Sequence, residues 1–341
     1  MSLSNPSGAT GLELSVRPEI WKYRQPFTIS RGTRTESTVV VVELRGVGPD
    51  GRAIVGCGES SPTGRYGETT DGVIAAIESL GAPLTAGLDR AGLQAALPPG
   101  AARNAVDCAF WDIEAKRAGR RVWELAELPA PAPLVTAYTL SLGPVEAMAK
   151  AAADHADRAL LKLKLSGPED LARVEAVHAN APNARLTVDA NEGWSPADYQ
   201  ALMPRLAALG VILIEQPLPA GKDAALAEMD RPIPVCADES CHDTASLAAI
   251  AGRYDVVNIK LDKTGGLTEA LRLKAAARAQ GYGIMVGCML GTSLAMAPAT
   301  VVAQGAAVVD LDGPLMLGHD REPGLLYENS LIHPPQAALW G

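Results

Sequence analysis

Five charged residues recur at a regular interval in the second half of the chain, and their types suggest acid–base chemistry around a metal ion. They are Lys164, Asp189, Glu215, Asp238 and Lys260, separated by 25, 26, 23 and 22 residues. Three carboxylates gathered in one place repel each other unless a cation lies among them, and hard oxygen ligands suit Mg²⁺. We therefore predict Asp189, Glu215 and Asp238 as metal ligands, against the alternative of three solvated loop acids. Glu192 and Glu239 lie beyond the strand ends and are expected in loops or behind the ligands.

The run LLKLKL at residues 160–165 places two lysines two positions apart. On a strand, Lys162 and Lys164 leave from the same face, while Leu161, Leu163 and Leu165 leave from the other. The alternative is an edge strand with its lysines in water. Inside a barrel, a second ammonium and a divalent cation would lower a lysine pKa from about 10.4 toward neutrality, which suits a general base.

Lys260 is expected to approach the three carboxylates from the side opposite Lys164. A carbon acid bound between the two amines would lose its proton to one and regain a proton from the other, which inverts the stereocentre. The carbanion next to a carboxylate is too unstable alone, so we expect a Mg²⁺-stabilised enediolate as the intermediate.

The elements that must position these residues are eight short apolar runs at a pitch of about 25 residues, with Ala- and Leu-rich helical stretches between them. The runs begin at residues 135, 160, 185, 211, 234, 255, 283 and 307. Eight strand–helix units favour a (β/α) barrel over an open doubly wound sheet. In such a barrel every strand ends on the same face, which would bring the five charged residues together.

The first 130 residues differ, because strands come first and helices follow, as in an α+β unit. We expect an α+β domain over residues 1–130, a barrel over 131–319, and a C-terminal tail over 320–341 that packs back on the first domain. The Pro-Ala-Pro-Ala-Pro run at 129–133 marks the join. GVGPDG at 46–51 precedes another strand and not a helix, so we interpret it as a hairpin loop and not as a dinucleotide site.

The composition is that of a globular chain, with 48% hydrophobic and 20% charged residues and a net charge of −9. The negative charge argues against a nucleic-acid or anionic-membrane surface. Five scattered cysteines without a CxxC pair suggest reduced thiols, and residues 1–16 show no export signal. We expect a cytoplasmic protein that acts on a small molecule.

Several motifs resemble those of the enolase superfamily, in its muconate-lactonizing-enzyme subgroup. They are Lys162-Leu163-Lys164, VDANEGW from Val188, IEQPLP from Ile214, CADES from Cys236 and NIKLDKTGG from Asn258. The resemblance covers nearly the whole chain. It implies a capping domain over a (β/α)₇β barrel, so that the eighth helix is missing or diverted. It also implies Lys164 and Lys260 as the acid–base pair with Lys162 assisting, and one Mg²⁺ per subunit.

The substrate is suggested by the last strand, where Asp310 and Asp312 form a D-x-D with both side chains on one face. Dipeptide epimerases of the subgroup use this motif for the substrate α-ammonium; the alternative is a solvated strand end. PFTISRGTRTES and GRYGET are similar to capping-domain loops of bacterial L-Ala-D/L-Glu epimerases. Arg31, with Arg34 or Arg65 as rivals, would then bind a glutamate side chain.

Two further positions bear on the substrate pocket. Thr139, at the end of the first barrel strand, is a candidate contact. Gly291 stands where many members of the subgroup have an acidic residue, which leaves the polarity of strand seven open.

These features predict a Mg²⁺-dependent dipeptide epimerase that interconverts L-Ala-L-Glu and L-Ala-D-Glu from cell-wall peptides. The alternatives are another dipeptide specificity, a lyase of the subgroup such as o-succinylbenzoate synthase, or a non-enzymatic binding protein. The sequence leaves open the residue preferred at the dipeptide N-terminus, the lysine that serves each enantiomer, and the oligomeric state, for which a homo-oligomer is one outcome.

Overall fold

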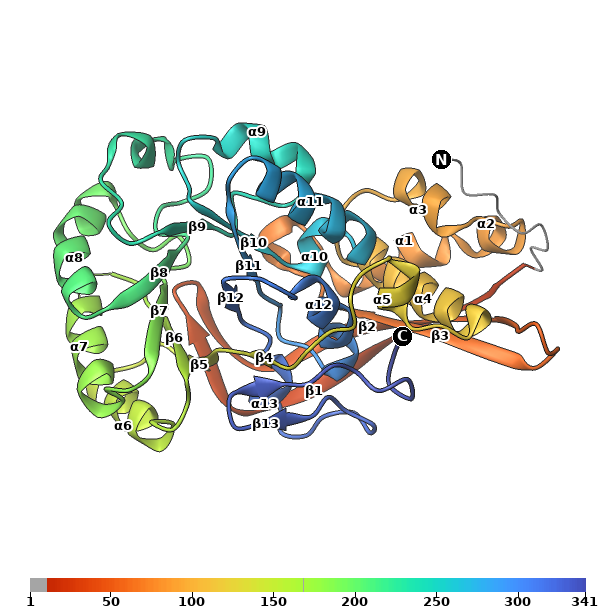
Figure 1. Ribbon diagram of the computed structural model, residues 1–341, viewed down its shortest axis with the longest axis horizontal. Helices are drawn as coiled ribbons and strands as arrows, with labels where there is room; N and C mark the ends of the chain where they lie inside the picture. Colours follow the sequence, from red (N-terminus) through yellow and green to blue (C-terminus); the bar gives the residue numbers. More distant parts are fainter. Residues whose placement is uncertain (1–10, 168) are drawn as a thin grey trace.

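The computed structural model describes residues 11–167 and 169–341. Residues 1–10, in which no export signal is expected, and Pro168 of the turn after LLKLKL lie outside the described residues. The chain forms a parallel barrel at one end and an antiparallel sheet with its helices at the other (Figure 1). Within the described ranges, no helix combines the length and the apolar character needed to span a membrane.

Eight parallel strands form the barrel, and each pairs with its neighbours in chain order. They are β5 (Tyr138–Leu140), β6 (Leu160–Lys164), β7 (Arg185–Asp189), β8 (Val211–Glu215), β9 (Val235–Ala237), β10 (Val256–Ile259), β11 (Gly283–Val286) and β12 (Val308–Val309). The backbone N–H of Ala137, just before β5, donates to the carbonyl of Val309 at 2.8 Å and so joins the first strand to the last. The predicted barrel is therefore confirmed over an open sheet.

Helices cover the outside of the barrel, and Figure 1 shows α6, α7 and α8 outside β6 to β8. They are α6 (Val145–Asp154), α7 (Asp170–Asn180), α8 (Pro196–Ala208), a 3₁₀ turn (Ala224–Glu228), a 3₁₀ turn (Thr244–Ser246) running into α9 (Leu247–Ile250), α10 (Leu261–Thr264), α11 (Leu267–Ala279), α12 (Ser293–Val302) and α13 (Gly313–Met316). Among the helices of the described residues, the short α13 alone follows β12, in agreement with the (β/α)₇β prediction.

The regular strand–helix alternation is interrupted after β8, where a 3₁₀ turn replaces the expected helix. Prolines flank this segment on both sides, at positions 217, 219, 232 and 234. A proline has no N–H and clashes with the preceding helical turn, so these prolines limit any helix between β8 and β9 to the residues between Pro219 and Pro232.

The strand period of two sorts the side chains of the barrel into an inner and an outer set. One inward layer is apolar and contains Ala137, Leu160, Leu213, Cys236, Val256, Met285 and Val308. Leu161, Leu163 and Leu165 belong to the core beneath the helices, as predicted. Lys162 and Lys164 point the other way, so the charged residues form the layers nearest the strand ends.

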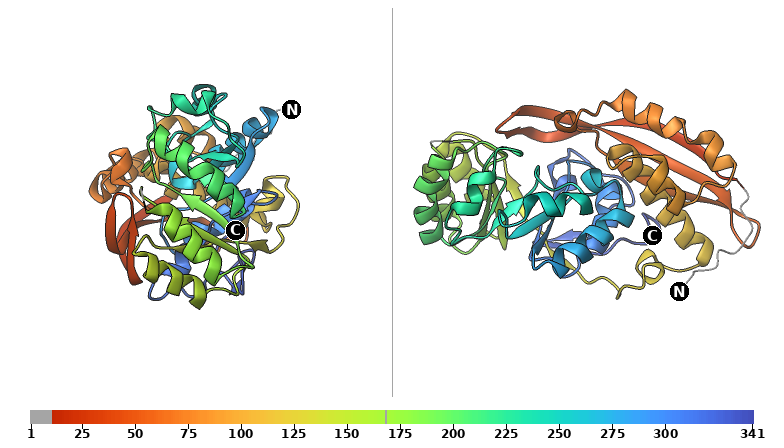
Figure 2. Two further views of the ribbon diagram at one scale, coloured as in Figure 1. Left: turned by 90° about the vertical axis from the view of Figure 1, so that its left-hand side faces the viewer. Right: turned by 90° about the horizontal axis from the view of Figure 1, so that it is seen from above.

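The capping unit is a three-stranded antiparallel sheet in the order β1-β2-β3, packed on one long helix and several short ones. The elements are β1 (Glu13–Ile29), β2 (Gly32–Val47), β3 (Ala53–Ser60), a 3₁₀ turn (Gly64–Tyr66), α1 (Thr70–Glu78), α2 (Gly81–Thr85), α3 (Arg90–Ala96), α4 (Ala101–Ala118) and α5 (Val122–Leu125). Val47 pairs with Ala53, so GVGPDG leads into a hairpin, as predicted. The β1–β2 hairpin reaches over the barrel (Figure 2).

The valine run of β2 is buried on both faces of the capping sheet. Val40 and Val42 pack against the cap helices, while Val39 and Val41 join the core shared with the barrel. On the neighbouring strand β3, a Cβ on Gly58 would lie 2.0 Å from the carbonyl oxygen of Ala105 in α4. Only glycine permits this approach, which sets the spacing between β3 and α4.

The C-terminal segment returns to both units. The strands β13 (Tyr327–Glu328) and β14 (Leu331–Ile332) form a small sheet with β4 (Leu134–Val135). Further on, the buried Trp340 donates its indole N–H to the carbonyl of Cys108, and Gly341 N–H donates to Asp112, both on α4. The expected packing of the tail on the first unit is confirmed, whereas the domain boundaries stay a prediction.

Candidate active site

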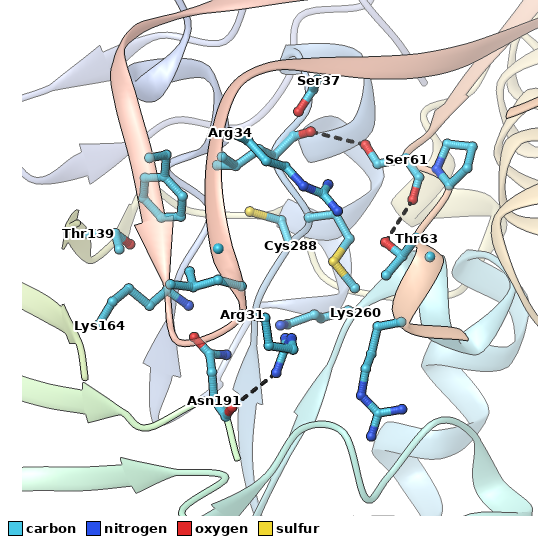
Figure 3. A pocket seen from close by; sticks show the side chains of 18 of the residues that line it. Arg31, Arg34, Ser37, Ser61, Thr63, Thr139, Lys164, Asn191, Lys260 and Cys288 are labelled. Carbon is cyan, nitrogen blue, oxygen red and sulfur yellow. Dashed lines mark hydrogen bonds between the residues drawn. The ribbon is translucent and has the colours of Figure 1, made fainter. Parts of the chain in front are cut away.

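The strand ends of the barrel open into a cavity of about 610 Å³ that the capping unit covers. The barrel contributes Lys164, Lys260 and Asp310, and the capping unit contributes its hairpin tip around Arg31 and the loop around Arg65. The cavity is thus formed by segments far apart in sequence, and Figure 3 shows some of the residues that line it.

Lys164 and Lys260 enter this cavity from opposite sides (Figure 3). Lys164 ends β6 and Lys260 follows β10, so β7, β8 and β9 lie between them in the barrel wall. Each ammonium has its own carboxylate partner: Lys164 Nζ lies 2.6 Å from Asp189 Oδ2, and Lys260 Nζ lies 2.6 Å from Asp238 Oδ2. The opposed placement predicted for the two amines is therefore the one that the structure has.

Lys162 lies deeper, with 1% of its surface exposed. Its ammonium contacts three carboxylates, at 2.6 Å from Asp310 Oδ2, 2.6 Å from Glu215 Oε2 and 3.3 Å from Asp189 Oδ2. Burying an ammonium is costly unless carboxylates and hydrogen bonds surround it, which this position provides. Lys162, on β6, therefore joins the ends of the next two strands, β7 and β8, to the residue that follows the last strand, β12.

The predicted metal ligands lie side by side at the ends of three adjacent strands. Asp189 and Glu215 are register partners, and Asp238 directly follows β9. A lysine ammonium lies against at least one oxygen of each carboxylate, and residues 11–167 and 169–341 contain no three His, Cys, Asp or Glu side chains grouped closely enough to hold a metal ion. In donor type the set fits a hard cation, because all three residues supply carboxylate oxygens, and the buried Glu215 Oε2 has the Lys162 ammonium at 2.6 Å as its charged neighbour. The ligand assignment stays a prediction.

The carboxylates of the site differ in the direction in which their surroundings shift their pKa values. Burial would raise the pKa of Asp189 and Asp238, but the neighbouring lysines outweigh burial and lower both pKa values. For Glu215, burial and the Asp189 charge outweigh Lys162 and raise the pKa. Burial and the Asp238 charge also raise the pKa of Glu239, to about 7.

At Lys162 and Lys260 the carboxylates of the site act against the lowering of a lysine pKa that was predicted from a second ammonium and a divalent cation. Burial alone would lower the pKa of Lys162 and Lys260, but the carboxylates that contact them raise both well above the ordinary value. The prediction counted a second ammonium and a divalent cation, and it left out the carboxylate paired with each lysine. In this arrangement the carboxylates decide the direction.

Asp310 and Asp312 both line the cavity, as the D-x-D motif predicted. They differ in their partners: Asp310 is paired with Lys162, whereas Asp312 Oδ2 accepts from the backbone N–H of Thr139 at 2.6 Å. Thr139 also donates its hydroxyl to Asp310 at 3.4 Å. Burial and the Asp310 charge raise the pKa of Asp312 to about 7.

The three candidate arginines lie in different situations, although all of them line the cavity. Arg65 uses both Nε and Nη2 to bind Glu192. Arg31 uses Nη1 alone, for the carbonyl of Asn191 at 3.1 Å and for two carboxylates. Arg34 points into the cavity in Figure 3, and its side chain makes no hydrogen bond to another described residue. The structure therefore favours Arg31 or Arg34 over Arg65 as a ligand for a substrate anion.

Gly291 lies beside a carboxylate from the other unit of the chain. A Cβ at this position would lie 2.9 Å from Oε1 of Glu59, a buried residue of β3. Glu59 accepts from the backbone N–H of Thr292 at 2.7 Å and pairs with Arg321. Glycine here makes room for an acidic residue of the capping unit.

Sequence reasoning missed Lys263, which is fully buried behind Asp238. Its ammonium donates to Asp238 Oδ1 at 2.7 Å and to the carbonyls of Asp238, Cys241 and Asn258. The available signal was its position in NIKLDKTGG, three residues after Lys260. Sequence reasoning also left Glu192 without a partner, whereas in the structure its carboxylate accepts four hydrogen bonds from three residues, Arg31, Arg65 and Ala220.

Comparison with known proteins agrees with this geometry. The profile "Mandelate racemase / muconate lactonizing enzyme, N-terminal domain" matches residues 11–126, and "Enolase C-terminal domain-like" matches residues 145–337. An L-Ala-D/L-Glu epimerase of Escherichia coli (strain K12) is 46% identical over 322 residues, 94% of this chain and 99% of its own. An N-acetyl-D-glutamate racemase of Pseudoalteromonas sp is 44% identical over 288 residues, 84% of this chain and 91% of its own.

A crystal structure from Agrobacterium tumefaciens gives the same result for the fold. It is described as an enolase family member with homology to dipeptide epimerases, with bound sodium and L-Ala-L-Glu and an ordered loop. The two structures superpose with a TM-score of 0.94 at 53% identity, over 97% of this chain and 100% of the other. The chain belongs to the enolase superfamily, with the capping domain of the mandelate racemase and muconate lactonizing enzyme group and an enolase-like C-terminal barrel.

Proposed function

We propose that this chain is a Mg²⁺-dependent dipeptide epimerase that interconverts L-Ala-L-Glu and L-Ala-D-Glu. The observation that carries the proposal is the placement of Lys164 and Lys260, which enter one cavity from opposite sides. A single amine could only return a proton to the face from which it was taken, whereas two opposed amines invert the carbon between them.

The reaction is a proton exchange in which no other group is transferred. The neutral amine of one lysine takes the α-proton of the glutamate residue, so that the Cα–H bond breaks and its electrons remain on the substrate. The ammonium of the other lysine then delivers a proton to the opposite face and becomes neutral. A cation held by Asp189, Glu215 and Asp238 would stabilise the negative charge that develops on the substrate carboxylate.

The remaining groups fit the two ends of a dipeptide. Asp310 and Asp312 lie together on the cavity wall and would receive the α-ammonium. Arg31 binds its present partners through Nη1, which leaves the Nε and Nη2 edge for the glutamate side chain. Lys162 would hold Asp310 and Glu215 in place from below.

The relatives support this substrate class. The Escherichia coli relative is an L-Ala-D/L-Glu epimerase, and the Agrobacterium tumefaciens structure holds L-Ala-L-Glu. We also propose that the chain acts in the metabolism of cell-wall (murein) peptides. Other dipeptide specificities and a lyase such as o-succinylbenzoate synthase are the alternatives.

A second candidate function is racemisation of N-acylated glutamate. The Pseudoalteromonas relative is an N-acetyl-D-glutamate racemase, and the present structure has a feature that bears on this choice. Asp310 is already paired with Lys162, and Asp312 has a raised pKa, so the negative charge available for an ammonium is reduced. A neutral amide in place of the ammonium would need no negative charge on Asp310 or Asp312.

Deuterium exchange decides between these reactions. The enzyme with Mg²⁺ in D₂O is given L-Ala-L-Glu or N-acetyl-L-glutamate, and the mass shift and chirality of each are followed. We expect one deuterium at the glutamate α-carbon and equilibration to the D-form, faster for the dipeptide. Faster turnover of N-acetyl-L-glutamate would support the second function, and exchange with neither would reject both.

Several wider expectations belong to the same proposal. The five cysteines form no disulfide in the structure, which supports a reducing, cytoplasmic location. The net charge of −9 supports a small-molecule substrate and no nucleic-acid partner. We also propose the domain boundaries 1–130 and 131–319, with a homo-oligomer as the assembly to test.

A further inference from the structure

The carboxylate of Glu192 joins four loops at the rim of the cavity. Glu192 follows β7 and receives Arg65 Nε and Nη2 from the capping loop, each at 2.8 Å. It also accepts from the backbone N–H of Ala220, in the segment after β8, at 2.8 Å. Arg31, at the tip of the β1–β2 hairpin, contacts its second oxygen at 3.2 Å.

This arrangement differs from an ordinary surface ion pair. Surface pairs contribute little in general, and the exceptions are bidentate arginine–carboxylate pairs and charge networks. The Glu192 side chain is only 10% exposed, and both of its oxygens accept charge-assisted bonds. Burial would raise the pKa of Glu192, but the bonds from Arg65 and Ala220 outweigh burial and lower it.

The backbone around Glu192 is also fixed. Asn191 and Glu192 have φ angles of 44° and 68°, in the left-handed region that non-glycine residues seldom adopt. The carbonyl of Asn191 accepts from Ser30 Oγ at 2.8 Å and from Arg31 Nη1 at 3.1 Å. The turn therefore presents a carbonyl to the hairpin tip and a carboxylate to both capping loops.

The arginine contacts distinguish the roles of Arg31 and Arg65. The planar Nε–Nη2 edge of a guanidinium matches a carboxylate, and in Arg65 Glu192 occupies that edge. In Arg31, Glu192 and Glu239 are both bound through Nη1, at 3.2 and 3.0 Å. The carboxylate-binding edge of Arg65 is thus occupied by Glu192. Arg31 contacts the same Glu192 carboxylate, so the Arg65–Glu192 pair helps to orient Arg31.

We propose that Arg65 and Glu192 form a positioning pair that holds the capping loop 61–67 on the barrel and orients Arg31 toward the side-chain carboxylate of the substrate. This inference rests on the proposed function and assigns neither residue to the proton transfer. Loss of the pair should weaken substrate binding and leave the proton transfer between Lys164 and Lys260 nearly unchanged.

The test is a double-mutant cycle with Glu192→Gln, Arg65→Met and the combined variant. Each single change should raise KM for L-Ala-L-Glu about tenfold and alter kcat by less than about threefold. The combined variant should have a KM close to that of the single variants, because either change alone already breaks the pair. Glu175→Gln is the matched control, since it breaks the exposed Arg205–Glu175 pair between α8 and α7.

Hydrogen exchange supplies a readout that needs no turnover. In Glu192→Gln, amides of residues 27–34 and 61–67 should exchange faster than in the unchanged protein, whereas Glu175→Gln should leave them unaltered. The inference is overturned if these amides keep their protection, if both single variants keep KM within about twofold, or if their effects on KM multiply. Absence of turnover in the unchanged protein would instead reject the proposed function, and the exchange data would still decide the pairing.

Discussion

The ammonium of Lys162 lies 2.6 Å from Oδ2 of Asp310 and joins the lysine strand β6 to the end of β12. The contact matters because Asp310 belongs to the pair proposed to bind the substrate ammonium. Its charge is shared with a lysine of the protein, so Asp312, which contacts the backbone of Thr139, is the better probe of ammonium recognition.

Asp312→Asn should weaken the binding of L-Ala-L-Glu, because the amide keeps the bond from Thr139 N–H but carries no charge. We expect KM to rise about 10- to 100-fold, the effect of losing one charged hydrogen bond. Steady-state kinetics measures it, and N-acetyl-L-glutamate, which has no ammonium, is the control ligand. An unchanged KM for the dipeptide would favour a lyase or the N-acyl-glutamate reaction.

Lys260→Ala should strongly slow epimerisation and keep the α-proton exchange of one of the two enantiomers. With one amine left, Lys164 can still remove the α-proton of one enantiomer and return a deuteron to the same face. The epimerisation rate should fall about 10²- to 10⁴-fold. Nuclear magnetic resonance in D₂O follows the α-proton of each dipeptide separately; equal exchange of the L,L and L,D forms would contradict the two-base arrangement.

Lys162→Met should destabilise the protein, because Asp189, Glu215 and Asp310 would lose the ammonium that they share. Removal of one partner from a buried ion pair costs about 3–5 kcal/mol. Urea unfolding at pH 7 with EDTA measures the free energy of unfolding. Lys150→Met is the control, since its pair with Asp154 is exposed and should contribute under about 0.5 kcal/mol. Similar losses in both variants would refute the expected difference.

Asp262 should make stability depend on pH. Burial raises its pKa from 3.8 to about 7, although Ser61 N–H and Asn104 donate to it. Between these values the folded protein keeps a proton that the unfolded chain has lost, so its contribution to the free energy of unfolding falls as pH rises.

Asp262→Asn removes this titration and keeps an oxygen for both donors. As the pH rises from 4.5 to 7.5, the free energy of unfolding of the variant should therefore increase relative to that of the unchanged protein by about 2–4 kcal/mol. Urea unfolding at the two pH values gives the difference. If the difference in free energy of unfolding between the variant and the unchanged protein is the same at both pH values, Asp262 does not titrate in this range.

The sequence allowed the layout of the barrel and the position of its charged residues to be predicted. The reason is physical: parallel strands at one pitch end on one face, so Asp189, Glu215 and Asp238 had to meet there. The contacts between loops could not be predicted from the strand pattern. Arg65 and Glu192 lie 127 positions apart, and no local pattern shows which capping loop meets which barrel loop.

Two local features were also beyond the reach of the strand pattern. Lys263 lies on α10, which begins directly after Lys260 and turns its ammonium back toward Asp238. The pattern treated the stretch as a strand end and gave this residue no partner. The 3₁₀ turn after β8 was missed because the strand–helix alternation predicts a full helix at that place.

The close approach of Gly58 to α4 has a consequence for experiments that rank positions by their tolerance to change. Asn104 and Arg103 on α4 bind Asp262, Thr264 and Gly265, the residues that follow Lys260. A side chain at position 58 would push α4 away and shift this segment with it. In a library of random variants selected for turnover, Gly58 would be as depleted as Lys260, so depletion alone would not identify the residues that touch the ligand.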